Sequence, residues 1–274
     1  MKLISLALAV SSLLSAVNIA FVHADGGAAK EGEMSWGYRD NDPKMYGPAQ
    51  WGKKNANCDG KRQSPIDISS TVIASPTPRP ALFFKGKCHD FQLNQTEESY
   101  KASVQGGSCT VIKSNEVYSL AQFHMHTPSE HMLNSKPFDG EAHFVHSNAD
   151  GSALLVVGLF LEKKENAETN PWVANVWKSL SNLTEETPTY LKLHSYSKML
   201  AATAAKGKVF NYAGSLTTPA CSEIVDWWVI QTPVQVSPVD FDKFMGYMKK
   251  LSAANDGQTA RPVQPLNDRT VTAY

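Results

Sequence analysis

The chain has 274 residues, 42% of them hydrophobic, and its 26 basic and 26 acidic side chains cancel. This length is enough for one large domain with a substantial core, or for two small ones. The balanced charge argues against a nucleic-acid partner, and the lack of any block of like charges argues against a charged interaction tail.

The N-terminus reads as an export signal. Lys2 precedes a long apolar run that ends near ValHisAla at residues 22–24. Small residues at Val22 and Ala24 fit a signal-peptidase site, so we predict a signal peptide over residues 1–24. The mature chain, residues 25–274, is then secreted or otherwise extracytoplasmic, with no membrane span. The alternative is an uncleaved membrane anchor, because the apolar run is nearly long enough to cross a bilayer.

Residues 25–60 are rich in Gly, Asn, Asp and Pro and contain few strand or helix signals. Four aromatic side chains are interspersed, namely Trp36, Tyr38, Tyr46 and Trp51. We expect this segment to wrap over the core, with the aromatic rings as its anchors.

The next part of the chain indicates a β-rich fold. Short runs such as 81–84 and 100–104 are separated by Pro, Gly and Asn, at intervals typical of an all-β architecture. The apolar run at 153–161 does not alternate, which predicts a central strand buried on both faces.

Two segments read as surface helices. Residues 170–180 begin with an Asn cap followed by Pro, and residues 237–251 place Ser237 and Asp240 in a capping-box arrangement. Both have apolar residues at a spacing that packs one face on a sheet. With no internal repeat and no linker, we predict one domain.

Four cysteines in an exported chain allow three pairings, and counting cannot choose among them. None of the four has the spacing of a metal site. Sequons at 94–96 and 182–184 make Asn94 and Asn182 possible N-glycosylation sites if the exporting cell is eukaryotic. The alternative is that both sequons occur by chance.

A candidate metal site lies in two runs, 122–126 and 141–146. Along a strand, side chains alternate faces, so His124 and His126 point to one side, and His143 of the second run can join them. Three imidazoles with an open fourth position are typical of a catalytic zinc site. Gln122 and Glu141 each share a face with a ligand and can accept its other ring N–H. The competing interpretation is that alternating histidines are a structural feature of a strand.

The motifs resemble those of the α-class carbonic anhydrases, in the same order and with similar gaps. The resemblance runs from about residue 35 to the C-terminus and rests on SerTrpGlyTyr (35–38), ArgGlnSerProIleAsp (62–67), GlnPheHisMetHis (122–126), SerGluHis (129–131), GluAlaHisPheValHis (141–146), GlySerLeuThrThrPro (214–219) and ArgProValGlnProLeuAsn (261–267). It implies an α/β, mostly β domain around a large, mainly antiparallel sheet with a few surface helices, and Zn²⁺ at the bottom of a conical cleft. It also implies reversible hydration of CO2 to bicarbonate and a proton by zinc-bound hydroxide.

The resemblance assigns roles to individual residues. The Thr217 hydroxyl accepts the hydroxide's proton as a hydrogen bond and donates its own proton to Glu130, which without the family match reads as an ordinary surface carboxylate. Thr218 contacts substrate, and Tyr38 lines the active-site water network. The positions that match the hydrophobic wall for CO2, each of which could equally be plain core, are Val145, Val156, Leu216, Val225 and Trp227.

The resemblance also implies covalent features. It pairs Cys58 with Cys221, which leaves Cys88 with Cys109, and it predicts a cis Ser64–Pro65 bond. Ser108 stands at the position aligned with the proton-shuttling His of the fastest family members, and Ser cannot titrate near neutral pH, so we expect slower proton release. A cis bond is costly before a residue other than Pro, so we expect a trans path at Pro219–Ala220.

Two rival functions follow from the same residues. One is a non-catalytic carbonic-anhydrase-like protein that keeps the fold for binding or structural use; such relatives lose zinc-ligating histidines, and all three are present here. The other is an unrelated secreted zinc hydrolase, which does not explain the GlySerLeuThrThrPro match. The sequence indicates no oligomeric state.

Overall fold

The computed structural model describes residues 35–69, 72–76 and 82–274. The signal peptide predicted for residues 1–24 lies outside these ranges. No helix in the described part of the chain is long and apolar enough to cross a membrane.

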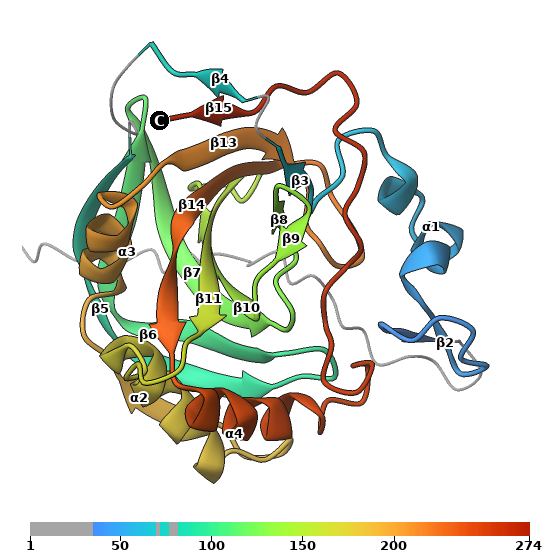
Figure 1. Cartoon of the computed structure of the whole chain (residues 1–274), viewed down its shortest axis with the longest axis vertical. Helices are drawn as coiled ribbons and strands as arrows, with labels where there is room; N and C mark the ends of the chain where they lie inside the picture. The colour runs from blue at the N-terminus through green and yellow to red at the C-terminus, as the bar shows by residue number, and fades with distance from the viewer. Residues whose placement is uncertain (1–34, 70–71, 77–81) are drawn as a thin grey trace, which may run out of the picture.

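A ten-stranded mixed sheet forms the centre of the molecule (Figure 1). The order across the sheet is β12-β5-β6-β7-β10-β11-β14-β13-β15-β4. Neighbours are antiparallel except for the pairs β11–β14 and β15–β4. The predicted large, mainly antiparallel sheet is therefore confirmed. The strands are β4 (Ile73–Ala74), β5 (Leu82–Gln95), β6 (Tyr100–Lys113), β7 (Glu116–His126), β10 (Gly140–Ser147), β11 (Leu154–Lys163), β12 (Thr189–Lys192), β13 (Val209–Gly214), β14 (Val225–Val236) and β15 (Thr272–Ala273).

The apolar run predicted to be a central strand is β11. It pairs with β10 on one side and with β14 on the other, and its residues from Leu155 to Leu161 are all buried. A strand with core on both faces needs no alternation of polar and apolar residues, which explains its continuous hydrophobic sequence.

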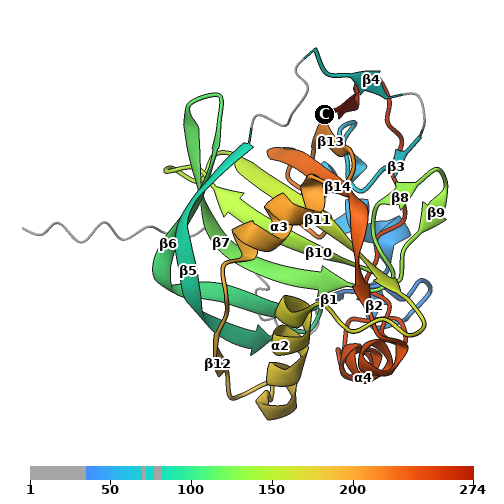
Figure 2. The same ribbon diagram turned by 60° about the vertical axis from the view of Figure 1, so that its left-hand side comes forward.

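Strands β5 and β6 are longer than the short runs read from the sequence. Each has 14 residues, and they form one long hairpin on the outer side of the sheet (Figure 2). The glycines taken as breaks lie inside the strands. Gly86 and Gly107 have φ values of 74° and 88°, and the ladder shifts register near residues 88–91. Bulges of this kind absorb a residue with positive φ and let pairing continue.

The two predicted helices are present as α2 (Pro171–Ser179) and α4 (Pro238–Met248). Asn170 caps α2 by accepting from the Trp172 N–H, and Ser237 caps α4 by accepting from the Asp240 N–H. In a capping box the acidic side chain also accepts from the backbone N–H of the cap residue. In α4 this second bond runs through Thr169. The Ser237 N–H donates to the Thr169 hydroxyl at 3.0 Å, and that hydroxyl donates to Asp240 at 2.6 Å.

A further helix, α3 (Tyr196–Ala204), was not predicted. Its sequence contains several small residues and few large apolar ones, so its helical pattern is weak. The remaining elements are short: β1 (Ser35–Trp36), β2 (Met45–Tyr46), α1 (Trp51–Lys54), β3 (Asp67–Ile68), β8 (Met132–Leu133), β9 (Lys136–Pro137), and 3-10 helices at Pro48–Gln50, Ala56–Asp59 and Leu180–Asn182.

The two faces of the sheet have different coverings. Helices α2, α3 and α4 pack on one face over the larger hydrophobic core, where Trp177 of α2 stacks on Phe244 of α4. A smaller cluster that includes Val145, Val156 and Trp227 lies on the other face. Because side chains alternate along a strand, β10 sends Phe144 to the helix side and Val145 to the opposite side.

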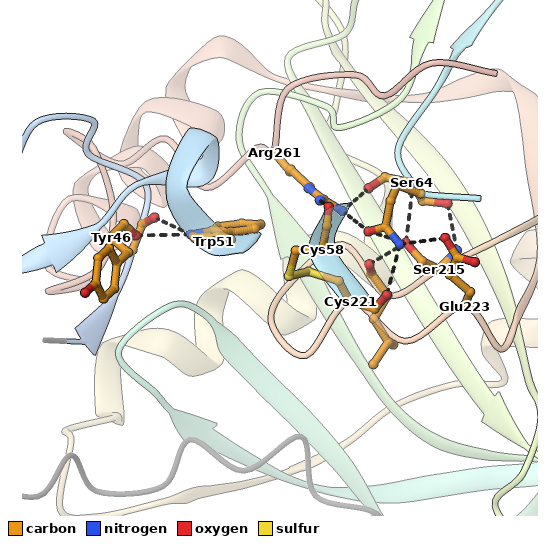
Figure 3. Close-up of a disulfide and its surroundings, with 11 residues drawn as sticks. Tyr46, Trp51, Cys58, Ser64, Ser215, Cys221, Glu223 and Arg261 are labelled. Carbon is orange, nitrogen blue, oxygen red and sulfur yellow. Dashed lines mark hydrogen bonds between the residues drawn. A yellow bond between two sulfur atoms is a disulfide. The ribbon is translucent and has the colours of Figure 1, made fainter. Parts of the chain in front are cut away.

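Two disulfides are present, Cys58–Cys221 and Cys88–Cys109, which is the pairing that the resemblance implied. Figure 3 shows the first of them beside the Arg261 guanidinium, which donates to carbonyl oxygens of Cys58 and Ser64. The guanidinium also lies 5.4 Å from the ring of Trp51. Trp51 is fully buried and packs edge-on against Trp36 and Tyr38, so the N-terminal segment is anchored by aromatic rings.

Candidate metal centre

Three histidines from two adjacent strands meet on the face of the sheet that the long helices do not cover. His124 of β7 lies directly opposite His143 of β10, and His126 follows two residues after His124 on the same face. The ring centroids are 4.8 to 5.3 Å apart. One nitrogen from each ring lies within 4.8 Å of the others, close enough to share a single metal ion. His126 and His143 are buried, whereas His124 is half-buried.

Each of the three rings has an oriented partner behind it. His124 Nδ1 lies 2.8 Å from Gln122 Oε1, and His143 Nε2 lies 3.1 Å from Glu141 Oε1, so both residues expected as outer partners are in place. The partner of His126 was not predicted: its Nδ1 lies 2.7 Å from the carbonyl oxygen of Thr259. A backbone carbonyl carries no side-chain signal, so sequence reasoning had no means of finding it.

The partners decide which ring nitrogens remain for a metal. With Nδ1 engaged, His124 and His126 offer Nε2, and with Nε2 beside Glu141, His143 offers Nδ1. His126 Nε2 is buried and has no hydrogen-bond partner among the described residues. A buried nitrogen without a hydrogen-bond partner, close to one nitrogen of each of the other two histidines, completes a set of three ligands that fits a zinc ion.

Burial keeps two of the rings neutral. It holds the pKa of His124 well below its usual value, helped by repulsion from His126 and His143, and it also lowers the pKa of His126. Burial acts in the same direction on His143, but the adjacent Glu141 carboxylate outweighs it and raises the pKa of that ring. Metal ligation requires neutral imidazole, which two of these environments favour before any ion is bound.

Glu141 is the centre of a buried network that sequence reasoning missed. Its Oε2 accepts the backbone N–H groups of Glu130 and His131 at 3.0 and 2.8 Å, and its Oε1 lies 2.8 Å from His131 Nδ1. His131 Nε2 lies 2.7 Å from the Tyr212 hydroxyl, which in turn bonds Ser64. Burial alone would raise the pKa of Glu141, but the charges and hydrogen bonds of His131 and His143 hold it well below its usual value. A fully buried carboxylate needs several hydrogen-bond donors. This requirement was the available signal that Glu141 has further polar partners.

Glu130 is not a surface carboxylate. It is buried, its Oε1 accepts the Arg261 backbone N–H at 2.9 Å, and its Oε2 lies 3.5 Å from His126 Nε2 and 3.8 Å from His143 Nδ1. Oε2 has no hydrogen-bond partner among the described residues. The carboxylate therefore points at the ligand nitrogens with one oxygen free to accept.

Thr217 lies in the loop between β13 and β14, and it is also buried. In the described structure no hydrogen bond joins Thr217 to Glu130, so the bond implied by the resemblance is not formed here. The neighbouring Thr218 is half-buried, and its carbonyl accepts the Cys221 N–H at 2.7 Å.

The path of this loop corrects one expectation. The Pro219–Ala220 bond is cis, not trans, whereas the predicted cis bond at Ser64–Pro65 is present. Contacts distant in sequence hold the segment that follows: Cys221 is bonded to Cys58, and its carbonyl accepts from the Gln63 side chain at 3.2 Å. These contacts override the local preference for trans.

The apolar positions expected to form a wall lie together. Val145 is opposite Val156, and Val156 is opposite Trp227, so the three cross β10, β11 and β14 on the ligand face. Trp227 also contacts His143 edge-on, with ring centroids 4.8 Å apart. Val225 belongs to the same cluster, and Leu216 packs against it from the β13–β14 loop.

Tyr38 lies near Glu130, although it comes from the N-terminal segment. Its buried hydroxyl has no hydrogen-bond partner among the described residues. Burial raises the pKa of Tyr38 well above its usual value, and the negative charges of Glu130 and Glu98 add to the effect.

Ser108 does not lie at the site, which corrects the alignment made from the sequence. It is exposed and pairs with Lys87 of β5, on a stretch of β6 where the ladder to β7 is interrupted between Ser103 and Thr110. The β6 residue opposite Gln122 is Ser103.

Comparisons with known proteins agree with this arrangement. A sequence model described as eukaryotic-type carbonic anhydrase matches residues 46–274. The carbonic anhydrase of Pectobacterium carotovorum is 32% identical over 248 residues, covering 89% of this chain and 93% of that protein. The solved structure of Photobacterium profundum alpha-carbonic anhydrase has a TM-score of 0.71 at 29% identity, covering 87% of this chain and 100% of its own. The alpha-carbonic anhydrase of Thermovibrio ammonificans, in complex with the inhibitor sulfanilamide, has a TM-score of 0.71 at 31% identity, covering 88% and 100%.

Proposed function

Because this chain belongs to the eukaryotic-type carbonic anhydrase family, we propose that it catalyses the zinc-dependent, reversible hydration of CO2 to bicarbonate and a proton. The observation that carries the proposal is the convergence of one nitrogen each from His124, His126 and His143. A zinc ion held by three imidazoles lowers the pKa of a water to about 7, for which carbonic anhydrase is itself the standard example.

The protein's part is first to hold the three rings in place. Gln122 and the Thr259 carbonyl hold the rotation and tautomer of His124 and His126, and the Glu141 carboxylate lies 3.1 Å from His143 Nε2, where it favours the orientation that leaves Nδ1 for the metal. Burial of His126 and His143 keeps bulk water away from two of the three ligands.

Glu130 and Thr217 are the residues we propose to orient the attacking oxygen. Glu130 Oε2 is a buried acceptor without a partner, and Thr217 lies in the adjacent β13–β14 loop. A Thr hydroxyl that donates to this carboxylate can only accept at its other side, which selects ligands able to donate a proton there.

CO2 is apolar and requires a site that does not favour water. The buried positions Val145, Val156 and Trp227, beside His143, supply such a surface on the ligand face. Val225, Leu216 and Thr218 complete the surroundings we propose for the substrate.

We expect proton release to limit the hydration rate, because no exposed histidine of the described residues lies beside the ligands. The exposed histidines among the described residues, His89 and His194, lie on β5 and after β12, at the outer edge of the sheet. We therefore expect external buffer to carry the proton, and the maximal hydration rate should rise with imidazole concentration. A rate that is independent of imidazole would show an efficient internal route.

The deciding experiment is stopped-flow CO2 hydration on the wild type beside His126→Ala, with zinc content measured on both. Loss of one ligand should remove most of the bound zinc and of the rate. A primary sulfonamide should block the wild type. A wild-type protein that stays metal-free in zinc-supplemented medium would favour the non-catalytic binding protein instead.

We also propose that the chain is exported, with residues 1–24 removed and 25–274 remaining as the catalytic domain. Two disulfides support this, because such bonds persist in oxidising compartments. Of the two sequons, Asn182 is exposed and Asn94 is half-buried within β5, so Asn182 is the better glycan acceptor. Intact-mass analysis of the exported protein tests both the cleavage and the glycans.

A further inference from the structure

Lys101 lies on the same face of the sheet as the candidate zinc ligands. The ladder between β6 and β7 pairs Ala102 with Phe123 and Ser103 with Gln122. Ala102 is buried in the core on the helix side, so its neighbour Lys101 points to the opposite face, as His124 does. Continuing the antiparallel register by one residue places Lys101 beside His124.

This edge of the site is the one that solvent reaches. His124 is the half-buried ligand, and Gln122, Ser103 and Lys101 are also half-buried, whereas His126 and His143 are buried. An ion that reaches His124 from solvent therefore comes close enough to the half-buried Lys101 to feel its charge, as His124 itself does.

Lys101 pairs with Glu98, whose Oε1 lies 3.7 Å from its Nζ. The side chains are 32% and 21% exposed, so the pair is partly shielded from water. Its two charges act on different parts of the site: Lys101 helps to depress the pKa of His124, and Glu98 helps to raise the pKa of Tyr38. The other carboxylates near the ligands are buried: Glu141 lies behind His143, and Glu130 faces the nitrogens of His126 and His143.

We propose that Lys101 is a specificity-determining residue that favours small anions at the metal site, with Glu98 limiting its effect. The inference rests on the proposed function, because it assumes that zinc occupies the three-histidine site. Binding of a neutral molecule such as CO2 adds no charge, so a nearby ammonium has little influence on it. An anion brings a negative charge next to His124, and the ammonium stabilises that charge by Coulomb attraction.

The test is the dissociation constant of azide for the zinc-loaded protein, measured by titration calorimetry at fixed pH and low ionic strength. For a half-exposed charge, we expect Lys101→Met to weaken azide roughly threefold and Lys101→Arg to stay close to the wild type. Glu98→Gln should strengthen azide binding by a similar factor. The matched control is Lys178→Met, which removes an exposed lysine of α2 on the opposite face.

Two further readouts separate charge from shape. The difference between wild type and Lys101→Met should shrink as salt is added, since screening weakens the attraction. The change in kcat/KM for CO2 should be smaller than the change in azide affinity. The inference is overturned if Lys101→Met binds azide as the wild type does, if Lys101→Arg weakens it as much as Met, or if Glu98→Gln also weakens it.

The outcome also distinguishes this inference from the proposed function. A wild type that hydrates CO2, with azide affinity insensitive to Lys101, overturns the role of Lys101 alone. A wild type that binds zinc and azide but does not hydrate CO2 overturns the proposed function and leaves the azide comparison intact.

Discussion

At the scale of single residues, the site is defined by polar groups that are buried and directed at one another. Glu130 illustrates this, because its chemistry depends on surroundings that its sequence neighbours do not reveal. One oxygen is held by the Arg261 N–H, while the other faces the ligand nitrogens without a partner. A carboxylate in this position can accept a proton-donating hydroxyl, and an amide of the same shape cannot do so equally well.

The Glu130→Gln substitution should therefore lower kcat for CO2 hydration by about 10- to 100-fold while the zinc content stays near one per chain. Stopped-flow rates and elemental analysis on the same preparation check both statements. The matched comparison is Glu162→Gln, at a half-exposed position of β11, which should leave the rate unchanged. Equal rates for the wild type and Glu130→Gln would contradict the role proposed for this residue.

His146 gives a second prediction at this scale. It is buried between the Leu155 carbonyl at 3.1 Å and the Tyr196 hydroxyl at 2.8 Å, and burial lowers its pKa from 6.5 to about 4. In the unfolded chain His146 is protonated as the pH falls through about 6.5, whereas in the folded chain it is protonated only as the pH falls through about 4. Stability is therefore fully present above pH 6.5 and is lost as the pH falls, by roughly 2 to 3 kcal/mol at pH 4.5.

Urea denaturation at pH 7.5 and pH 4.5 measures this loss. The His146→Gln variant should be less stable at pH 7.5 but should lose less stability on acidification, because it lacks the titrating ring. If both proteins lose the same free energy of unfolding between the two pH values, His146 does not contribute to the acid sensitivity.

At the scale of elements, the strands that carry the ligands could be predicted, and the segments that support them could not. The spacing of His124, His126 and His143 predicted both strands, because side chains alternate between the two faces along a strand and these three must share one face to meet. Helix α3 was missed, since its small residues give no clear stripe. The length of the β5–β6 hairpin was underestimated, since glycines that end one strand continue another through a bulge. The supporting contacts of Thr259 and His131 join residues that are far apart in the sequence, and local sequence patterns carry no information about such contacts.

The two disulfides differ in what they support. Cys58–Cys221 joins residues 163 apart and holds the β13–β14 loop, whereas Cys88–Cys109 joins residues 21 apart inside one hairpin. Loop-closure entropy makes removal of the longer bridge more costly by about 2 kcal/mol, for a Cys58→Ala/Cys221→Ala protein compared with Cys88→Ala/Cys109→Ala. Guanidinium titrations of the two double variants measure the difference.

The same two variants also separate the effect on the site from the effect on stability. Under conditions in which both remain folded, loss of Cys58–Cys221 should lower the hydration rate, because Thr217 lies in the released loop. Loss of Cys88–Cys109 should not lower it. Equal effects of both variants on the rate would show that the tether is not needed to position the loop.

At the scale of the whole molecule, the two faces of a single sheet have different roles, one in folding and one in the proposed catalysis. Its helix-covered face buries the larger core, and its other face carries the ligands and the apolar wall. The architecture was predicted through the family resemblance and not through periodicity, which had indicated only a β-rich chain. A zinc ion held by His124, His126 and His143, as we propose, would join β7 to β10 and would bind the folded state in preference to the unfolded one.

Removal of zinc should therefore lower the melting temperature. At a free zinc concentration about a thousand times the dissociation constant, binding stabilises the fold by about 4 kcal/mol, or roughly 10 °C for a chain of this size. Thermal melts with and without a chelator measure the shift, and re-addition of zinc should restore it. His126→Ala should show a much smaller shift; the same shift in that variant would mean that the ion binds elsewhere.

The hydrogen bond between His126 and the Thr259 carbonyl spans 133 positions of the chain. During synthesis, His126 leaves the ribosome long before its partner does, and until then the ring has nothing to fix its rotation. The His126 ring can take its final orientation toward the proposed metal only when nearly the whole polypeptide has been made. A nascent chain stalled before residue 259 should therefore hold zinc less tightly than the full-length protein does.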